Sequence, residues 1–313
     1  MKHRSTPAMR VLAILLMIVT AGCSREVTQR DFASIDDAVG ALVGAARSDD
    51  TRGLLKVLGK EAEPAIDSGD PVQDRNARGR FVQAYEAGHT LSRGTDGETT
   101  LLVGADHWPF PFPLIQHNGR WRFDSAAGSD EIVNRRVGDN ELSTIQTSLA
   151  FVDAEREYYM RNPQQAALLQ FSQKLVSTKG QKDGLYWPTS GDEPPSPLGE
   201  GFARAQGEGY FEKGASKSEP LRGYFYRLLT AQGPNARGGA YSYLVDGKMI
   251  GGFALIAVPS EYGRSGVMTF IVNHDGEVFS KDLGQETATV AKDIQTFDPD
   301  STWRPEAATE QIP

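Results

Sequence analysis

The sequence contains one cysteine, Cys23, and its neighbours predict a specific modification. It follows Thr20-Ala21-Gly22, and small residues directly before a cysteine are what lipoprotein signal peptidase accepts, although leucine is commoner than threonine at the first of these positions. Cleavage there makes the cysteine the new N-terminus, and several acyl chains attached to it anchor a protein stably to a membrane. We therefore expect lipidation of Cys23. The alternative is an ordinary cleaved signal peptide followed by an incidental cysteine.

The residues before Cys23 have the order of a signal peptide. Lys2, Arg4 and Arg10 form a basic region without acidic residues, and an apolar run extends from Val11 to Ala21. This run of about 11 residues is shorter than the roughly 20 that span a bilayer, and it matches the apolar core of a signal peptide. Ser24 is not the aspartate that retains lipoproteins at an inner membrane. The sequence thus predicts a cell-envelope protein, held at the outer membrane and facing the periplasm.

The sequence offers no recognised catalytic set. It has no His-x-x-x-His pair, no Gly-x-Ser-x-Gly elbow and no glycine-rich phosphate loop. Thiol catalysis and a cysteine-ligated zinc site are excluded because the one cysteine is expected to carry lipid. Four histidines remain after His3 is removed with the signal peptide, and all of them fall at turns or loop edges. We therefore expect no metal, no cofactor and no catalytic residue, and the sequence favours a protein that is not an enzyme.

The net charge of the mature chain limits the kinds of partner that it is expected to bind. The chain has 33 basic and 41 acidic residues, and three of the basic ones lie in the signal peptide. The mature protein therefore carries 30 basic and 41 acidic side chains, a net charge of −11. Affinity for nucleic acid comes largely from lysine and arginine on phosphates, so nucleic acid is a poor partner. The expected partners are the membrane, through the N-terminal lipid, and an envelope protein or a small ligand.

One loop combines an acid with two aromatic residues, in Asp183-Gly184-Leu185-Tyr186-Trp187-Pro188. A small ligand would stack on Tyr186 and Trp187 and donate a hydrogen bond to Asp183. The alternative is structural: the two aromatic side chains anchor a long loop to the second domain, and Asp183-Gly184 makes a turn. Long irregular loops are often functional, which keeps the ligand site open as a hypothesis.

Two adjacent arginines, Arg135 and Arg136, form the second candidate site. They are a candidate for binding an anion. The alternative is an interdomain network of ion pairs with Asp130 and Glu131, which lie four to six positions earlier in the sequence.

The first part of the chain predicts helices followed by a sheet. Apolar residues recur every three or four positions after Ser34, a plausible N-cap, and further helices are expected near residues 51–58 and 75–86. Strands are expected at 99–103, 114–117 and 120–124, the last two joined by an Asn118-Gly119 hairpin. This order resembles the NTF2-like domains over residues 33–127.

The second part predicts a long helix and an antiparallel meander. After a linker at 125–138, we expect helices at 140–161 and 164–175, a glycine- and proline-rich loop at 177–217, and strands at 223–230, 240–245, 248–258, 267–273 and 277–281. A long helix laid on such a meander resembles the globular part of type IV pilins, over residues 128–304. The expected fold class is therefore α+β. The remaining segments are a signal peptide (1–22), a lipid-anchored tether (23–32) and a tail (305–313).

The mature chain as a whole resembles an uncharacterised family of exported bacterial proteins, domain of unknown function 2950. The resemblance spans about residues 32–303 and lies in runs such as Asp183–Pro188, Ser196-Pro197-Leu198-Gly199 and the stretch beginning Gly251-Gly252-Phe253. It implies no particular activity. We therefore expect a lipid-anchored binding or scaffold module. Two alternatives stay open: a periplasmic hydrolase that uses carboxylates near the 183–199 loop, and an accessory subunit of a pilus-like or secretion-like assembly.

Overall fold

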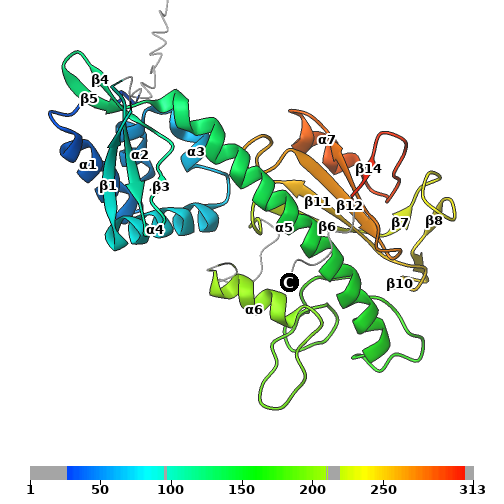
Figure 1. The fold of residues 1–313 in the computed structure, drawn as a ribbon. Coiled ribbons are helices and arrows are strands. Elements are labelled where there is room, and N and C mark those ends of the chain that lie inside the picture. The colour runs from blue at the N-terminus through cyan, green and yellow to red at the C-terminus, as the bar shows by residue number, and fades with distance from the viewer. Residues whose placement is uncertain (1–26, 95–96, 209, 211–218, 307–313) are drawn as a thin grey trace, which may run out of the picture.

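The computed structural model describes residues 27–94, 97–208, 210 and 219–306, and it shows two modules joined by one long helix, α5 (Ser125–Arg161) (Figure 1). Helices and antiparallel sheets occur in both modules, which confirms the α+β class. The predicted signal peptide, Cys23 and most of the predicted tail lie outside the described residues. No helix in the described ranges combines the length and apolar character needed to cross a membrane.

The first module places its helices before its sheet, as expected. The sheet has the order β1-β2-β4-β5, with β3 also paired to β2. Its elements are α1 (Ile35–Arg47), α2 (Thr51–Leu58), the 3-10 turn η1 (Lys60–Ala62), α3 (Glu63–Ile66), α4 (Pro71–Ala87), β1 (His89–Arg93), β2 (Thr99–Val103), β3 (Trp108–Pro109), β4 (Leu114–His117) and β5 (Arg120–Phe123).

Local sequence signals account for much of this module. Ser34 caps α1 by accepting a hydrogen bond of 3.1 Å from the Asp37 N–H, which confirms the predicted start of the helix. Asn118 and Gly119 have φ angles of 52° and 73°, as a two-residue hairpin between β4 and β5 requires. The apolar face of α1 is buried in the core of the module with Phe112, Leu114 and Phe123.

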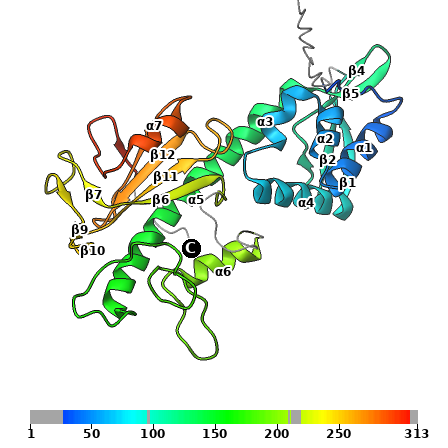
Figure 2. The same cartoon turned by 180° about the vertical axis from the view of Figure 1, so that it is seen from behind.

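Helix α5 is continuous from Ser125, so the expected linker at 125–138 is wrong. Asp124 caps its first turn by accepting hydrogen bonds from the Ala126 and Ala127 N–H groups. Gly128 then lets the helix approach the backbone of Pro111. The 37 residues of α5 extend about 55 Å at the usual helical rise, from the first module across the second (Figures 1 and 2).

The second module is built on a sheet of order β14-β13-β12-β11-β6. Further elements complete it: the short helices α6 and α7, and small two-stranded sheets formed by β7 with β8 and by β9 with β10. The bounds are α6 (Gly199–Gly207), β6 (Tyr224–Leu229), β7 (Ala231–Gln232), β8 (Tyr241–Ser242), β9 (Leu244–Val245), β10 (Lys248–Met249), β11 (Ala254–Pro259), β12 (Met268–Asn273), β13 (Val278–Asp282), α7 (Thr287–Asp293) and β14 (Arg304–Pro305).

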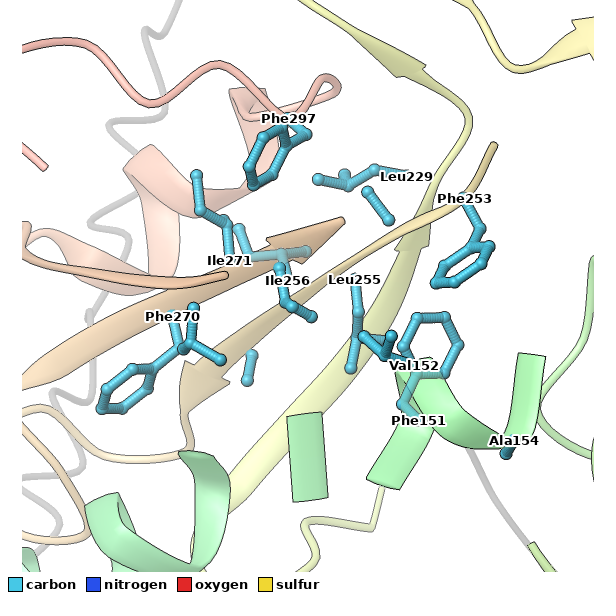
Figure 3. Packing of buried hydrophobic residues seen from close by; sticks show 14 of the residues in the cluster. Phe151, Val152, Ala154, Leu229, Phe253, Leu255, Ile256, Phe270, Ile271 and Phe297 are labelled. Atoms are coloured by element: carbon cyan, nitrogen blue, oxygen red, sulfur yellow. The ribbon is translucent and has the colours of Figure 1, made fainter. Parts of the chain in front are cut away.

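Both faces of this sheet are covered. Leu255 of β11 lies beside Val152 of α5 on one face, whereas Ile271 of β12 lies under Phe297 on the other (Figure 3). Side chains alternate between the faces of a strand, so the nearly continuous apolar run of β11 is explained by burial on both sides.

Two further expectations are corrected. Residues 162–198, in which a helix was expected at 164–175, form an irregular segment without a helix, here called the strap. Several of its backbone hydrogen bonds lie within it, such as that from the Tyr186 N–H to the Leu175 oxygen at 2.9 Å, and the Phe171 N–H donates outward to the Met249 oxygen at 2.8 Å. The strand expected at 248–258 is interrupted between β10 and β11 by Gly251-Gly252, where Gly252 has a φ of 141°. The predicted Asp246-Gly247 hairpin between β9 and β10 is confirmed.

Candidate functional site

The junction between the modules is organised around Arg136, in the first third of α5. Its guanidinium donates hydrogen bonds to the backbone oxygens of Pro64 and Ala65 in the first module. It also donates to the Arg264 oxygen in the second module, at 2.9 Å. The Arg136 side chain is 10% exposed and lies 3.9 Å from the carboxylate of Asp74. Arg136 thus connects both modules to the helix that they share.

Burial changes the ionisation of this pair. Desolvation lowers the pKa of Arg136, and the charge of Asp74 opposes that shift. Desolvation also raises the pKa of Asp74, opposed by hydrogen bonds with Ser68 and by the charges of Arg136 and Arg78. Each charge of the pair therefore compensates part of the desolvation cost of the other.

Asn140 extends the junction by one turn of α5. Its amide nitrogen donates to the Ser265 oxygen at 2.8 Å, and its amide oxygen accepts from Gln73 at 2.5 Å. Asn140 is 2% exposed. A second buried side chain of α5 therefore bonds to both modules.

Asp70 completes the junction from the first module. One carboxylate oxygen caps α4 by accepting from the Val72 and Gln73 N–H groups. The other accepts from the Tyr210 hydroxyl at 2.7 Å and from the Gly223 N–H at 2.8 Å. Burial, and next the charge of Asp70, raise the pKa of Tyr210, so its hydroxyl stays a donor. Asp70 itself is fully buried, with both oxygens bonded.

A hollow of about 510 Å³ lies beside this junction. Its lining comes from α3 and η1, from the first turns of α5, and from the β11–β12 turn of the second module. Glu61 and Asp130 supply acidic groups, and Arg264 supplies a basic one. None of these three forms an ion pair with another described residue, so the hollow presents charges of both signs to a ligand.

A smaller hollow of about 290 Å³ lies between α5 and the β12–β13 turn. Ile145 and Leu149 of α5 contribute apolar lining, and Asp275, Glu277 and Glu306 contribute acidic groups. Within the described part of the chain, no three His, Cys, Asp or Glu residues are grouped closely enough to hold a metal ion.

The structure separates the two predicted arginines. Arg136 uses its donors within the junction, whereas Arg135 is exposed and pairs with Glu131 one turn earlier. Successive helical residues point about 100° apart, so the two guanidinium groups do not converge on one anion. The predicted anion site stays a prediction. Arg136 does contact both modules, but through backbone oxygens and Asp74 and not through the ion pairs with Asp130 and Glu131 considered as the alternative.

Asp183, Tyr186 and Trp187 lie together in the strap, and the side chain of each contacts other residues of the strap or of α6. Burial acts to raise the pKa of the Asp183 carboxyl, but hydrogen bonds from Lys174 and Thr178 together outweigh it and hold the pKa below its usual range. Tyr186 stacks on Phe202, with ring centroids 4.0 Å apart.

Trp187 is 6% exposed, and its indole N–H is buried without a hydrogen-bond partner among the described residues. Lys182 lies over its ring. Neither hollow is lined by a strap residue. These contacts match the anchoring alternative, and the predicted ligand site remains untested.

Sequence reasoning missed Glu155, which is fully buried on α5 beneath the strap. One of its oxygens accepts a hydrogen bond of 2.8 Å from the Ser172 N–H, and the other has no partner in the described chain. The available signal was position: Glu155 lies three residues after Val152 and three before Tyr158, both of which are buried on the same apolar stripe.

A family described as "Protein of unknown function (DUF2950)" matches residues 29–305. The chain belongs to this family. No curated protein and no solved structure matches it. The NTF2-like and pilin-like resemblances of the two modules therefore stay predictions.

Proposed function

We propose that this member of the DUF2950 family is an exported, lipid-anchored envelope protein that acts as a two-module binding scaffold and not as an enzyme. The observation that carries the proposal is the junction: Arg136 on the shared helix α5 bonds to backbone oxygens of both modules. Modules joined by a linker usually move relative to one another unless their interface is large and apolar. Here a shared helix and buried polar groups replace a linker, which favours a fixed spacing between two surfaces.

The sequence before the described chain supports the anchor. The apolar run, Thr20-Ala21-Gly22 and the single Cys23 together match a lipoprotein signal. The described chain enters the first module directly, since Gln29 donates to the Phe123 oxygen and the Arg30 N–H donates to the Lys56 oxygen. A lipid on Cys23 would therefore hold the first module close to the membrane. The outer membrane, with the protein facing the periplasm, is the location that Ser24 favours.

The hollow beside the junction is the surface that such a scaffold would offer to a ligand. Residues of both modules line it, so one ligand would contact both at once. Glu61 and Asp130 would attract a cationic group and Arg264 an anionic one. We propose that the ligand carries both charges, as a peptide or a zwitterionic envelope component does.

The hydrolase alternative has less support. Two carboxylates that divide acid and base roles must face one substrate position. Near the 183–199 loop, Glu155 is buried beneath the strap and Asp183 is bonded to Lys174 and Thr178 at the surface. The two therefore do not line a shared pocket of the kind that a hydrolase needs.

The assembly-subunit alternative predicts a continuous apolar strip along the outer face of α5. Charged pairs interrupt that face, including Glu131 with Arg135 and Glu157 with Arg161. Leu142 and Met160 are exposed on α5, but 18 positions separate them in the sequence. Isolated apolar side chains are normal on a surface and do not require a partner.

Affinity purification from the native envelope tests the scaffold. The compared proteins are wild type, Cys23→Ser and Arg264→Glu, with Arg135→Glu as a matched reversal of charge away from the hollow. We expect a partner or ligand that is retained by wild type and Arg135→Glu, and is depleted with Arg264→Glu. If the partner were lost with Cys23→Ser but retained with Arg264→Glu, binding would take place at the membrane and not at the hollow. Equal recovery with all four proteins would contradict the proposal.

A further inference from the structure

Glu155 is the most deeply buried of the described carboxyl groups that the proposed scaffold does not use. Its relative exposure is 0%, and within the described chain its side chain accepts a hydrogen bond from the backbone N–H of Ser172 in the strap. Its second oxygen is buried without a partner in the described chain. A carboxylate in such a place is costly unless it is paired, whereas the neutral acid is tolerated more easily.

The strap closes over Glu155 through several contacts near Ser172. Phe171 stacks on Tyr159 of α5, with ring centroids 4.8 Å apart, and its ring edge meets Phe253 at the same distance. Tyr158, in the next turn of α5 after Glu155, donates to the Lys182 oxygen at 3.0 Å. Glu155 and this aromatic cluster therefore hold the same segment against the helix.

Among the described residues, no cation pairs with Glu155. On the strap, Lys174 pairs with Asp183 and Lys182 pairs with Glu193. On the sheet side, the ring of His274 lies against the ring of Phe253 in an edge-to-face arrangement.

On α5, burial raises the pKa of Tyr158 to about 12, with the charges of Glu155 and Asp183 adding to the shift. Arg156 is directed elsewhere, to the His274 oxygen and to Asp153. Burial raises the pKa of Glu155 well above its usual range, opposed only by the Ser172 N–H.

We propose that Glu155 and the strap form a pH-sensitive latch, which is closed while Glu155 is protonated and opens when Glu155 ionises. Ionisation releases the proton to solvent and leaves an unpaired carboxylate in an apolar site. Opening the strap lets water reach that carboxylate, so rising pH shifts the equilibrium towards the open state. The open state would expose the aromatic cluster around Phe171.

Hydrogen exchange of the full mature chain tests the latch. Peptides from residues 162–198 are followed between about pH 5 and about pH 9, a range that includes the pKa values known for buried glutamates. Exchange is corrected for its intrinsic rate at each pH. We expect strap protection in wild type to fall by up to about tenfold for each pH unit between the ordinary pKa of 4.5 and the raised pKa of Glu155, and to level off above it. Peptides from α4 serve as the internal reference and should keep their protection.

Two variants separate the latch from a general effect of pH. Glu155→Gln keeps the shape of the neutral acid and cannot ionise, so its strap should stay protected across the range. Asp153→Asn removes an exposed carboxylate from the same helix and should behave as wild type. The proposal would be overturned if the protection of the wild-type strap did not change with pH. It would also be overturned if strap protection in Glu155→Gln fell with pH as it does in wild type. If Glu155→Gln fails to fold, the wild-type protein alone still tests the latch. An equal loss of hydrogen-exchange protection in strap and α4 peptides as pH rises would refute it.

Discussion

The guanidinium of Arg136 donates a hydrogen bond of 2.9 Å to the backbone oxygen of Arg264, which follows it by 128 positions in the chain. The same side chain bonds to the oxygens of Pro64 and Ala65. One residue of α5 thereby touches both modules, and the proposed function depends on this relationship. Its consequences can be tested on stability without knowledge of the ligand.

Arg136→Ala should destabilise the protein by more than about 2 kcal/mol, because three carbonyl oxygens lose a charged donor and Asp74 loses its partner. Arg135→Ala is the matched control. Its pair with Glu131 is exposed, so its removal should change stability by less than about 0.5 kcal/mol. Denaturant unfolding followed by circular dichroism measures both. Equal effects would show that the junction contributes little.

Asp70 and Asp50 both cap helices, but only Asp70 also bonds to the second module. Asp50 accepts a hydrogen bond from the Gly53 N–H at an exposed position, so Asp50→Ala should cost about 1 kcal/mol. Asp70→Ala also leaves the Tyr210 hydroxyl and the Gly223 N–H without their buried acceptor, and should cost about 3 kcal/mol or more. The same unfolding measurement applies, and equal costs for both caps would contradict the role of Asp70.

Two glycines of α5 should respond in opposite directions to alanine. A Cβ at Gly128 would lie 2.5 Å from the Pro111 backbone oxygen, so Gly128→Ala should destabilise the protein by about 1–3 kcal/mol despite its better helix propensity. Gly138 has no atom within 4 Å of such a Cβ, so Gly138→Ala should stabilise the protein by up to about 1 kcal/mol. Thermal midpoints of the two variants give the signs. A stabilising Gly128→Ala would mean that α5 does not approach Pro111 this closely.

Glu155 should make stability fall as pH rises. The folded state keeps its proton above the ordinary pKa of 4.5, whereas the unfolded chain releases it, so stability is fully present below that pH. From there to the raised pKa, wild type should lose about 1.4 kcal/mol per pH unit relative to Glu155→Gln, until the strap opens. Unfolding curves for both proteins at several pH values provide the difference, in which the contribution of Asp74 cancels. A difference that does not vary with pH would contradict a protonated Glu155.

Local signals in the sequence predicted local features. Asn118-Gly119 and Asp246-Gly247 predicted hairpins because their turn geometry depends on those two residues alone, and Ser34 predicted a helix start for the same kind of reason. The first turns of α5 escaped prediction because residues 125–138 show little apolar periodicity. They are helical through tertiary contacts, such as that of Gly128 with Pro111.

The candidate site was only partly predictable. The pattern singled out Arg135 and Arg136 together, yet which of two adjacent arginines faces the junction depends on how α5 packs on both modules. Asp70 and Asn140 gave no signal, because each bonds to groups more than 60 positions away in sequence. Glu155 was detectable as an acid on an apolar stripe, but only the strap above it shows that it is buried without a charged partner.

We propose that the chain acts at a membrane through a lipid on Cys23. The most direct measurement is intact mass and detergent-phase partition of the protein isolated from its native envelope, compared with Cys23→Ser. We predict that wild type lacks residues 1–22, carries acyl chains on Cys23 and enters the detergent phase, whereas Cys23→Ser lacks the acyl mass and stays in the aqueous phase. A wild-type protein that keeps residues 1–22, or that carries no acyl mass on Cys23, would contradict this proposal.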